Sequence, residues 1–141
     1  MVTVKNRRRL ELADDQMCFG CGKQNARGLC LKFDLERAKK RIKTRWEPTK
    51  EFQGYANIVH GGIIALILDE LMVNLLWTLD LPAVTAELTT RFHRPAGVGH
   101  AINCEARLVS KRGRLFRMEA EAKTLHGERI ASASAKCVRI K

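Results

Sequence analysis

The feature that most limits how this chain can fold is a long apolar segment from Ile58 to Leu79. Its length would allow a membrane span, but Asp69, Glu70 and Asn74 interrupt it, and a charge at the centre of a bilayer is costly. From Gly61 onward, apolar residues cover nearly the whole circumference of an α-helix, which is typical of a helix that other elements enclose. We therefore expect a buried helix and no membrane span.

Strand-like segments lie on both sides of this helix. Before it, Leu29–Leu35 and Ile42–Trp46 each place apolar residues on alternate positions, as half-buried strands do. After Pro82 come four further segments, which are Val84–Phe92, Ala101–Val109, Leu115–Leu125 and Arg129–Ile140.

The first of these four segments has two distinct faces by alternation. Val84, Ala86, Leu88 and Phe92 lie on one face, and Thr85, Glu87, Thr89 and Arg91 lie on the other. Short turns with Gly113 and Gly127 separate the last three segments, which favours an antiparallel meander. The order of two strands, one helix and four strands predicts an α+β fold, with one curved antiparallel sheet of about six strands around one central helix.

Length and composition indicate a single domain with an anionic partner. The 141 residues suit one domain, which we place at 18–141, after a polar segment over 1–17. No apolar stretch follows the basic residues Met1–Arg9, so we see no export signal and expect a cytoplasmic protein. The net charge of +11 points to an anionic partner, although part of it can serve solubility.

The five cysteines do not form a complete metal motif in the sequence. Cys18-x-x-Cys21 is half of a zinc knuckle, but no second pair of Cys or closely spaced His supplies the other ligands. Cys30 and His60 would complete it only through an unusual fold-back. We expect free thiols, no bound metal and no cofactor.

Two features of the helix segment could carry chemistry. Gly61 and Gly62 open the helix directly after His60, and free backbone N–H groups at such a start could form an oxyanion hole. The alternative is a plain junction at which His60 caps the helix. Asp69 lies in the middle of the helix, where a carboxylate needs a partner or a purpose; Glu70 competes for the same interpretation.

The spacing of His60 and Asp69 bears on the oligomeric state. Nine residues along a helix, they point about 180° apart and are separated by roughly 13 Å along the axis. One chain cannot readily bring them together. Two helices related by a two-fold axis could, so a site built from both predicts a homodimer with two shared sites.

These motifs resemble those of hotdog-fold thioesterases of the PaaI type, from the phenylacetate-degradation family. One signature is Cys18-Phe19-Gly20-Cys21-Gly22, followed by Asn25, Gly28-Leu29 and Phe33. The other is Gln53-Gly54, then His60-Gly61-Gly62, then Leu68-Asp69-Glu70. The resemblance covers about residues 18–140. It implies a hotdog fold, hydrolysis of acyl-CoA, and a homodimer that pairs into a dimer of dimers.

The resemblance also implies a role for each matching residue. Gly61 would donate its N–H to the thioester carbonyl, His60 would shape that turn, and Asp69 would be the general base or nucleophile. Thr85 would orient the attacking water. Further substrate contacts would come from Gln53, Asn57, Gly62 and Glu70. The sequence departs from the family at Gly54, where some close members carry an Asn six residues before the His.

Basic residues provide candidates for contacts with the three phosphates of CoA. Arg91 and Arg94 lie at the end of one strand, and Arg112 and Arg114 lie in one turn. The alternative is that these turns are charged only because they are solvated.

Other functions are possible on the same pattern. A non-catalytic acyl-CoA sensor could share the fold, although it would not need Asp69. A hotdog dehydratase shares the His and acid, but two glycines directly after the His are the thioesterase form. Nucleic-acid binding would suit the charge, yet aromatic residues make up only 6% of the chain and no recognition motif is present.

Overall fold

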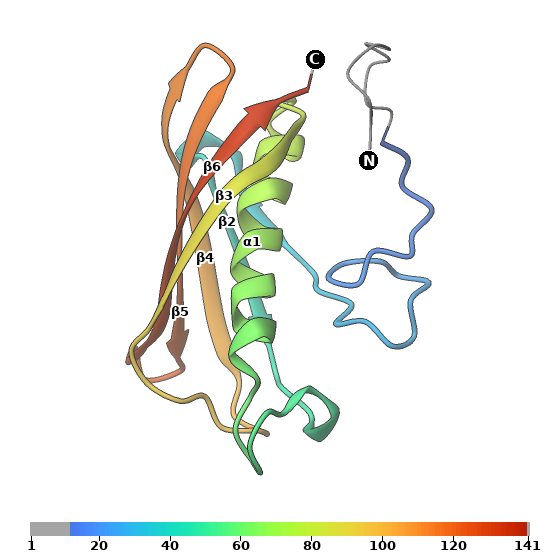
Figure 1. Cartoon of the computed structure of the whole chain (residues 1–141), viewed down its shortest axis with the longest axis vertical. Coiled ribbons are helices and arrows are strands. Elements are labelled where there is room, and N and C mark those ends of the chain that lie inside the picture. Colours follow the sequence, from blue (N-terminus) through green and yellow to red (C-terminus); the bar gives the residue numbers. More distant parts are fainter. Residues whose placement is uncertain (1–11, 141) are drawn as a thin grey trace.

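The computed structural model describes residues 12–140 and shows one long helix against a curved antiparallel sheet of six strands (Figure 1). In chain order the elements are β1 (Asp34–Glu36), η1 (Arg37–Lys39), β2 (Arg41–Trp46), η2 (Lys50–Phe52), α1 (Gly61–Thr78), β3 (Ala83–Phe92), β4 (Ile102–Arg112), β5 (Leu115–Thr124) and β6 (Arg129–Arg139). The predicted order and the predicted fold class are confirmed. Most of the polar segment expected over 1–17 lies outside the described residues.

The sheet order is β1-β2-β4-β5-β6-β3. The predicted meander is formed by β4, β5 and β6, which pair in sequence. β3 pairs only with β6 and therefore forms an edge of the sheet. This edge exposes large apolar side chains, Leu88 at 37% and Phe92 at 56%.

The inner face of the sheet is lined mainly by small residues. Alternation along β4, β5 and β6 buries Ala106, Ala120, Ala122, Ala133 and Ala135. Small side chains allow the helix to approach closely, and the bulk of the core then comes from α1. Its fully or nearly fully buried residues are Ile64, Ile67, Leu68, Leu71, Met72, Leu75 and Leu76. Each such side chain contributes about 1.5–3 kcal/mol through burial.

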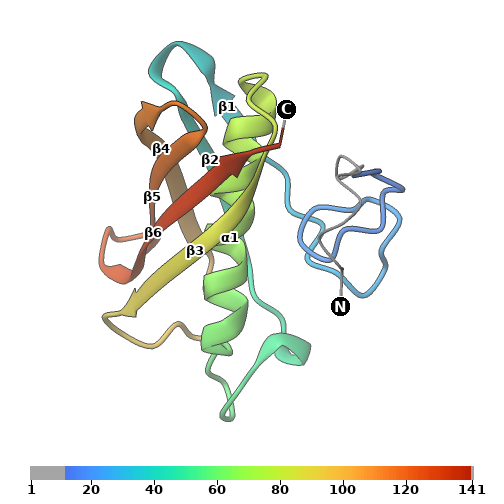
Figure 2. The same cartoon turned by 45° about the horizontal axis from the view of Figure 1, so that its top comes forward.

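The sheet covers only one side of α1, so the prediction of a fully enclosed helix was too broad. On the other side, Ile63, Leu66 and Val73 are half-buried and Trp77 is 41% exposed. The segment that precedes β1 passes this side (Figure 2). α1 is long and apolar enough to cross a membrane by composition alone, but it serves as the core helix of this fold.

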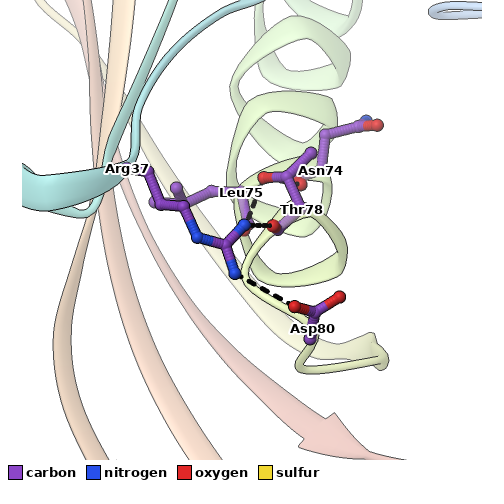
Figure 3. Close-up of polar contacts among 5 residues, drawn as sticks. All are labelled: Arg37, Asn74, Leu75, Thr78 and Asp80. Carbon is purple, nitrogen blue, oxygen red and sulfur yellow. Dashed lines mark hydrogen bonds and ion pairs between the residues drawn. The ribbon is translucent and has the colours of Figure 1, made fainter.

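The C-terminal end of α1 is closed by side chains (Figure 3). The Arg37 guanidinium donates to the Thr78 carbonyl at 2.6 Å and to the Asp80 carboxylate at 3.0 Å. The Thr78 hydroxyl lies 2.9 Å from the carbonyls of Asn74 and Leu75. A cation at this end also opposes the negative end of the helix dipole.

The strand predicted over Leu29–Leu35 is mostly irregular, since β1 covers only Asp34–Glu36. Leu29 and Leu31 are buried as expected, but their N–H groups donate to the carbonyls of Phe19 and Gly20 rather than to a neighbouring strand. Cys30 between them has a φ of 50°, which no strand accommodates. The alternation of apolar residues alone could not reveal that the segment from Leu29 to Leu31 pairs with the loop at Phe19 and Gly20.

A bulge in β3 corrects the predicted faces of that strand. The pairing with β6 shifts between Thr85 and Glu87, with Ala86 as the extra residue. Directly paired residues share a face, so Thr85 lies opposite buried Cys137 on the helix side. Beyond the bulge, Leu88 and Phe92 lie on the helix side as well, because their partners Ala135 and Ala131 are buried. Regular alternation had placed Thr85 on the opposite face from Leu88 and Phe92.

Candidate active site

The start of α1 is held by a short loop that folds back on itself. The N–H of His60 donates to the carbonyl of Phe52 at 2.9 Å, and the N–H of Gly54 donates to Ile58 at 2.8 Å. The side-chain oxygen of Gln53 accepts the N–H of Asn57 at 3.0 Å. The predicted substrate residues Gln53 and Asn57 therefore support the loop that presents His60.

One N–H at the start of α1 stays open. His60 Nδ1 accepts the Gly62 N–H at 2.8 Å, so His60 is the helix cap, as one alternative expected. The N–H groups of Ile63 and Ile64 donate to the His60 carbonyl. No acceptor for the Gly61 N–H is found among residues 12–140. An open donor at the positive end of a helix suits a developing oxyanion.

Asp69 has a polar partner on β3. The Thr85 hydroxyl donates to Asp69 Oδ1 at 2.7 Å, and both residues are half-buried. Thr85 comes directly before the bulge and is paired with buried Cys137, so its side chain lies on the helix side of the sheet. Cys137 lies beside this pair, and burial, opposed by a hydrogen bond with Thr85, raises the pKa of its thiol. The hydrogen bond with Thr85 uses Oδ1, so Oδ2 of Asp69 can accept a further proton or hydrogen bond.

His60 and Asp69 do not meet within one chain. His60 stands before the first turn of α1, whereas Asp69 faces β3 in the third turn. A cleft of about 1040 Å³ adjoins His60 and Gly62, but Asp69 does not line it.

The cleft beside His60 contains residues that the sequence interpretation did not assign to a site. Phe19 and Leu29 from the N-terminal loop form one part of its lining, and Trp46, Phe52 and Ile63 form another. Trp46 and Phe52 pack edge to face, with ring centroids 5.4 Å apart. Phe19 belongs to the first signature, which was the one sequence signal for this wall.

The four predicted CoA-binding arginines lie at two ends of the sheet. Arg94 follows β3 near the start of α1 and pairs with Glu128, while Arg91 lies opposite Ser132 on the outer face. Arg112 and Arg114 flank the turn between β4 and β5, at the end of the sheet where α1 finishes (Figure 1). Arg114 donates to the carbonyl of Arg139 at 2.7 Å. A single chain therefore does not gather the four into one site.

Glu70 faces the N-terminal loop and does not line the cleft. Its carboxylate accepts the Cys18 thiol at 3.1 Å and the Asn74 amide at 2.9 Å. Burial, together with the charge of Glu70, raises the pKa of the Cys21 thiol to about 12.

Comparison with known families identifies the class of protein. The model of the thioesterase superfamily matches residues 56–131, more than half of the chain. The chain belongs to the thioesterase superfamily. An uncharacterised protein of Schizosaccharomyces pombe is 30% identical over 108 residues, which cover 74% of this chain and 61% of that protein.

Solved structures of thioesterases share this hotdog fold. Protein RHA08564 of the thioesterase superfamily is 26% identical with a TM-score of 0.77, covering 83% of this chain and 57% of that one. The Escherichia coli PaaI protein of the phenylacetic acid degradation operon has a TM-score of 0.75 at 18% identity, with 80% of this chain and 81% of that one covered.

A third match is a hypothetical thioesterase from Streptococcus pneumoniae solved with coenzyme A. It has a TM-score of 0.73 at 13% identity, covering 77% of this chain and 84% of that one. The likeness to it and to PaaI is one of fold. This chain spans only 57–61% of RHA08564 and the yeast relative.

Proposed function

We propose that this chain hydrolyses acyl-CoA thioesters to a free acid and CoA, as a homodimer with two shared active sites. The observation that carries the proposal is the open Gly61 N–H at the start of α1, separate in one chain from the Thr85–Asp69 pair. An oxyanion donor and a carboxylate are the two groups that acyl transfer to water needs. The CoA-bound streptococcal thioesterase of the same fold supports CoA as the carrier.

In the proposed reaction, the thioester carbonyl oxygen accepts the Gly61 N–H of one chain, which stabilises the charge that develops on that oxygen. Asp69 of the second chain takes a proton from water as the water oxygen bonds to the carbonyl carbon. The C–S bond then breaks, its electron pair leaves with the CoA sulfur, and the proton is returned to that sulfur. Thr85 fixes the orientation of Asp69 through its hydrogen bond.

Asp69 could instead attack the carbonyl itself and form a mixed anhydride. A single turnover in ¹⁸O-labelled water separates the two routes. A general base leaves Asp69 unlabelled, whereas water that cleaves the anhydride at the Asp69 carbon puts label into this residue.

An exposed apolar edge of the sheet supports the proposed dimer. The edge strand β3 exposes Leu88 and Phe92, and α1 exposes Trp77 beside it. An apolar edge of this kind favours pairing with a second copy. Pairing of dimers into a tetramer is the further assembly that we propose. The five free cysteines suit a reducing compartment, for which we propose the cytoplasm.

The deciding experiment is an acyl-CoA panel with colorimetric detection of released thiol. We expect turnover that falls at least about a hundredfold in Asp69→Asn, the scale of losing a general base, while acyl-CoA binding changes little. Tight binding of CoA esters without any turnover would replace the enzyme with an acyl-CoA sensor.

A further inference from the structure

Outside the proposed active site, three side chains form a cluster where the N-terminal loop meets α1. Cys18 and Cys21 come from the N-terminal loop, and Glu70 comes from α1. Their donor atoms all lie within 4.8 Å of one another, and Cys18 Sγ is 3.1 Å from Glu70 Oε1. All three residues are half-buried.

The loop around this cluster is tightly built. A Cβ on Gly20 would lie 2.4 Å from Glu70 Cγ, and a Cβ on Gly22 would lie 2.5 Å from the Cys18 nitrogen. The Gly22 N–H donates to the Cys18 carbonyl at 2.8 Å. The two glycines thus let the cysteines turn toward each other while the loop presses against Glu70.

Glu70 is itself held in place. Asn74, one turn further along α1, donates to Glu70 Oε2 at 2.9 Å, which leaves Oε1 turned to Cys18. Ligand side chains in metal sites are oriented by second partners of this kind.

We propose that Cys18, Cys21 and Glu70 bind one Zn²⁺ ion, with water as the fourth ligand. Two thiolates and one carboxylate match the donors that zinc prefers, and a tetrahedral site would set them about 3.6–3.8 Å apart. Binding would release the two thiol protons to solvent. No other His, Cys, Asp or Glu of residues 12–140 joins the cluster, so the fourth position is left to water. The sequence alone predicts no metal site here, because Glu70 lies far along the chain from the two cysteines.

A metal here would tie the N-terminal loop to the helix. Phe19, between the two cysteines, lines the cleft beside His60. The ion would therefore fix one wall of that cleft. The proposed metal site does not depend on which ligand the cleft binds.

Metal content and cobalt spectra test the proposal without an activity assay. After growth with zinc and dialysis against metal-free buffer, we expect about one zinc ion per chain. Co²⁺ in its place should give a sulfur-to-metal charge-transfer band in the near ultraviolet. The double variant Cys18→Ser, Cys21→Ser should lose both signals, and Glu70→Gln should weaken zinc binding by more than about tenfold.

Cys30→Ser is the matched control, because Cys30 is exposed and its thiol is directed to the carbonyls of Gly22 and Asn25 instead of the cluster. It should keep the full metal content. Zinc in the unaltered chain no higher than in the double variant would overturn the proposal. So would equal zinc affinity in Glu70→Gln and the unaltered chain.

Discussion

The two ends of α1 differ in how many of their backbone N–H and C=O groups have hydrogen-bond partners. At the C-terminal end, the Leu79 N–H donates to the carbonyls of Leu75 and Leu76. The Asp80 N–H donates to the Trp77 carbonyl and Arg37 donates to the Thr78 carbonyl. At the N-terminal end, His60 takes the Gly62 N–H and leaves that of Gly61 open. An unpaired donor costs stability unless water or a ligand satisfies it. The C-terminal end of α1 is thus closed by protein groups, whereas the N-terminal end keeps the donor that we propose binds the thioester oxygen.

Gly61→Pro is the sharpest way to break this comparison, and its effect should be the largest. Proline lacks the N–H but suits the first position of a helix, and the His60 backbone at φ −59° and ψ 129° suits the residue before a proline. We expect kcat to fall by about a hundredfold to a thousandfold, with little change in melting temperature, as measured by thiol release and thermal denaturation.

Gly61→Ala is the control for that variant. It keeps the N–H and adds a Cβ that would lie 3.4 Å from the Phe92 ring, so it measures the steric part alone. A loss in Gly61→Ala as large as in Gly61→Pro would mean that the open donor is not the important feature.

A mixed dimer tests whether the open N-terminal end of α1 forms a site with Asp69 of the second chain. Gly61→Pro and Asp69→Asn homodimers should both be poorly active. When the two are unfolded together and refolded, about half the dimers should be mixed, and each holds one intact site. About a quarter of the full activity should return, given random pairing. Verified heterodimers no more active than their parents would contradict shared sites.

Arg112 and Arg114 lie at the closed end of α1 within one chain, so their use in CoA binding requires the partner as well. Changing both to Ala should raise KM several-fold with a smaller effect on kcat, because uniform binding is lost. Added salt should raise KM in the unaltered enzyme more than in this variant. Equal KM values would direct the search to Arg91 and Arg94 at the opposite end.

The smallest effect is expected at the closed end. Arg37→Ala should lower the free energy of unfolding by about 1 kcal/mol, since it removes two exposed hydrogen bonds and a favourable charge at the helix end. Chemical denaturation measures this, and kcat should not change. Arg37→Lys, which keeps the charge, should retain part of the stability. A fall in kcat in Arg37→Ala would mean that the two ends are coupled.

The sequence predicted the elements well where periodicity and turn residues agreed. The helix starts at Gly61 as expected, and the turns at Gly113 and Gly127 join the strands of the meander. Prediction failed where a tertiary contact overrides the local pattern. Leu29 and Leu31 alternate like a strand, but their N–H groups are used by the N-terminal loop.

The candidate site was predictable in its residues more than in its arrangement. His60 and Gly61 stood out because a histidine and two glycines open the helix, and Asp69 because a carboxylate interrupts an apolar run. The role of Glu70 could not be foreseen, because its contact with Cys18 joins positions 52 residues apart. The cleft wall at Phe19 likewise brings the N-terminal loop beside residues far along the chain.

Because of the bulge in β3, the local twist beside Thr85 depends on the number of residues in the strand as well as on their identity. Thr85 pairs with Cys137 and Glu87 pairs with Lys136, so Ala86 has no partner of its own. A chain lacking Ala86 could keep every other pair of this ladder in register. It would lose the local twist that bulges add next to Thr85, so we expect the hydrogen bond between Thr85 and Asp69 to weaken although both residues are unchanged. Scanning by substitution leaves strand length unchanged, so only a library of single-residue deletions would expose this dependence.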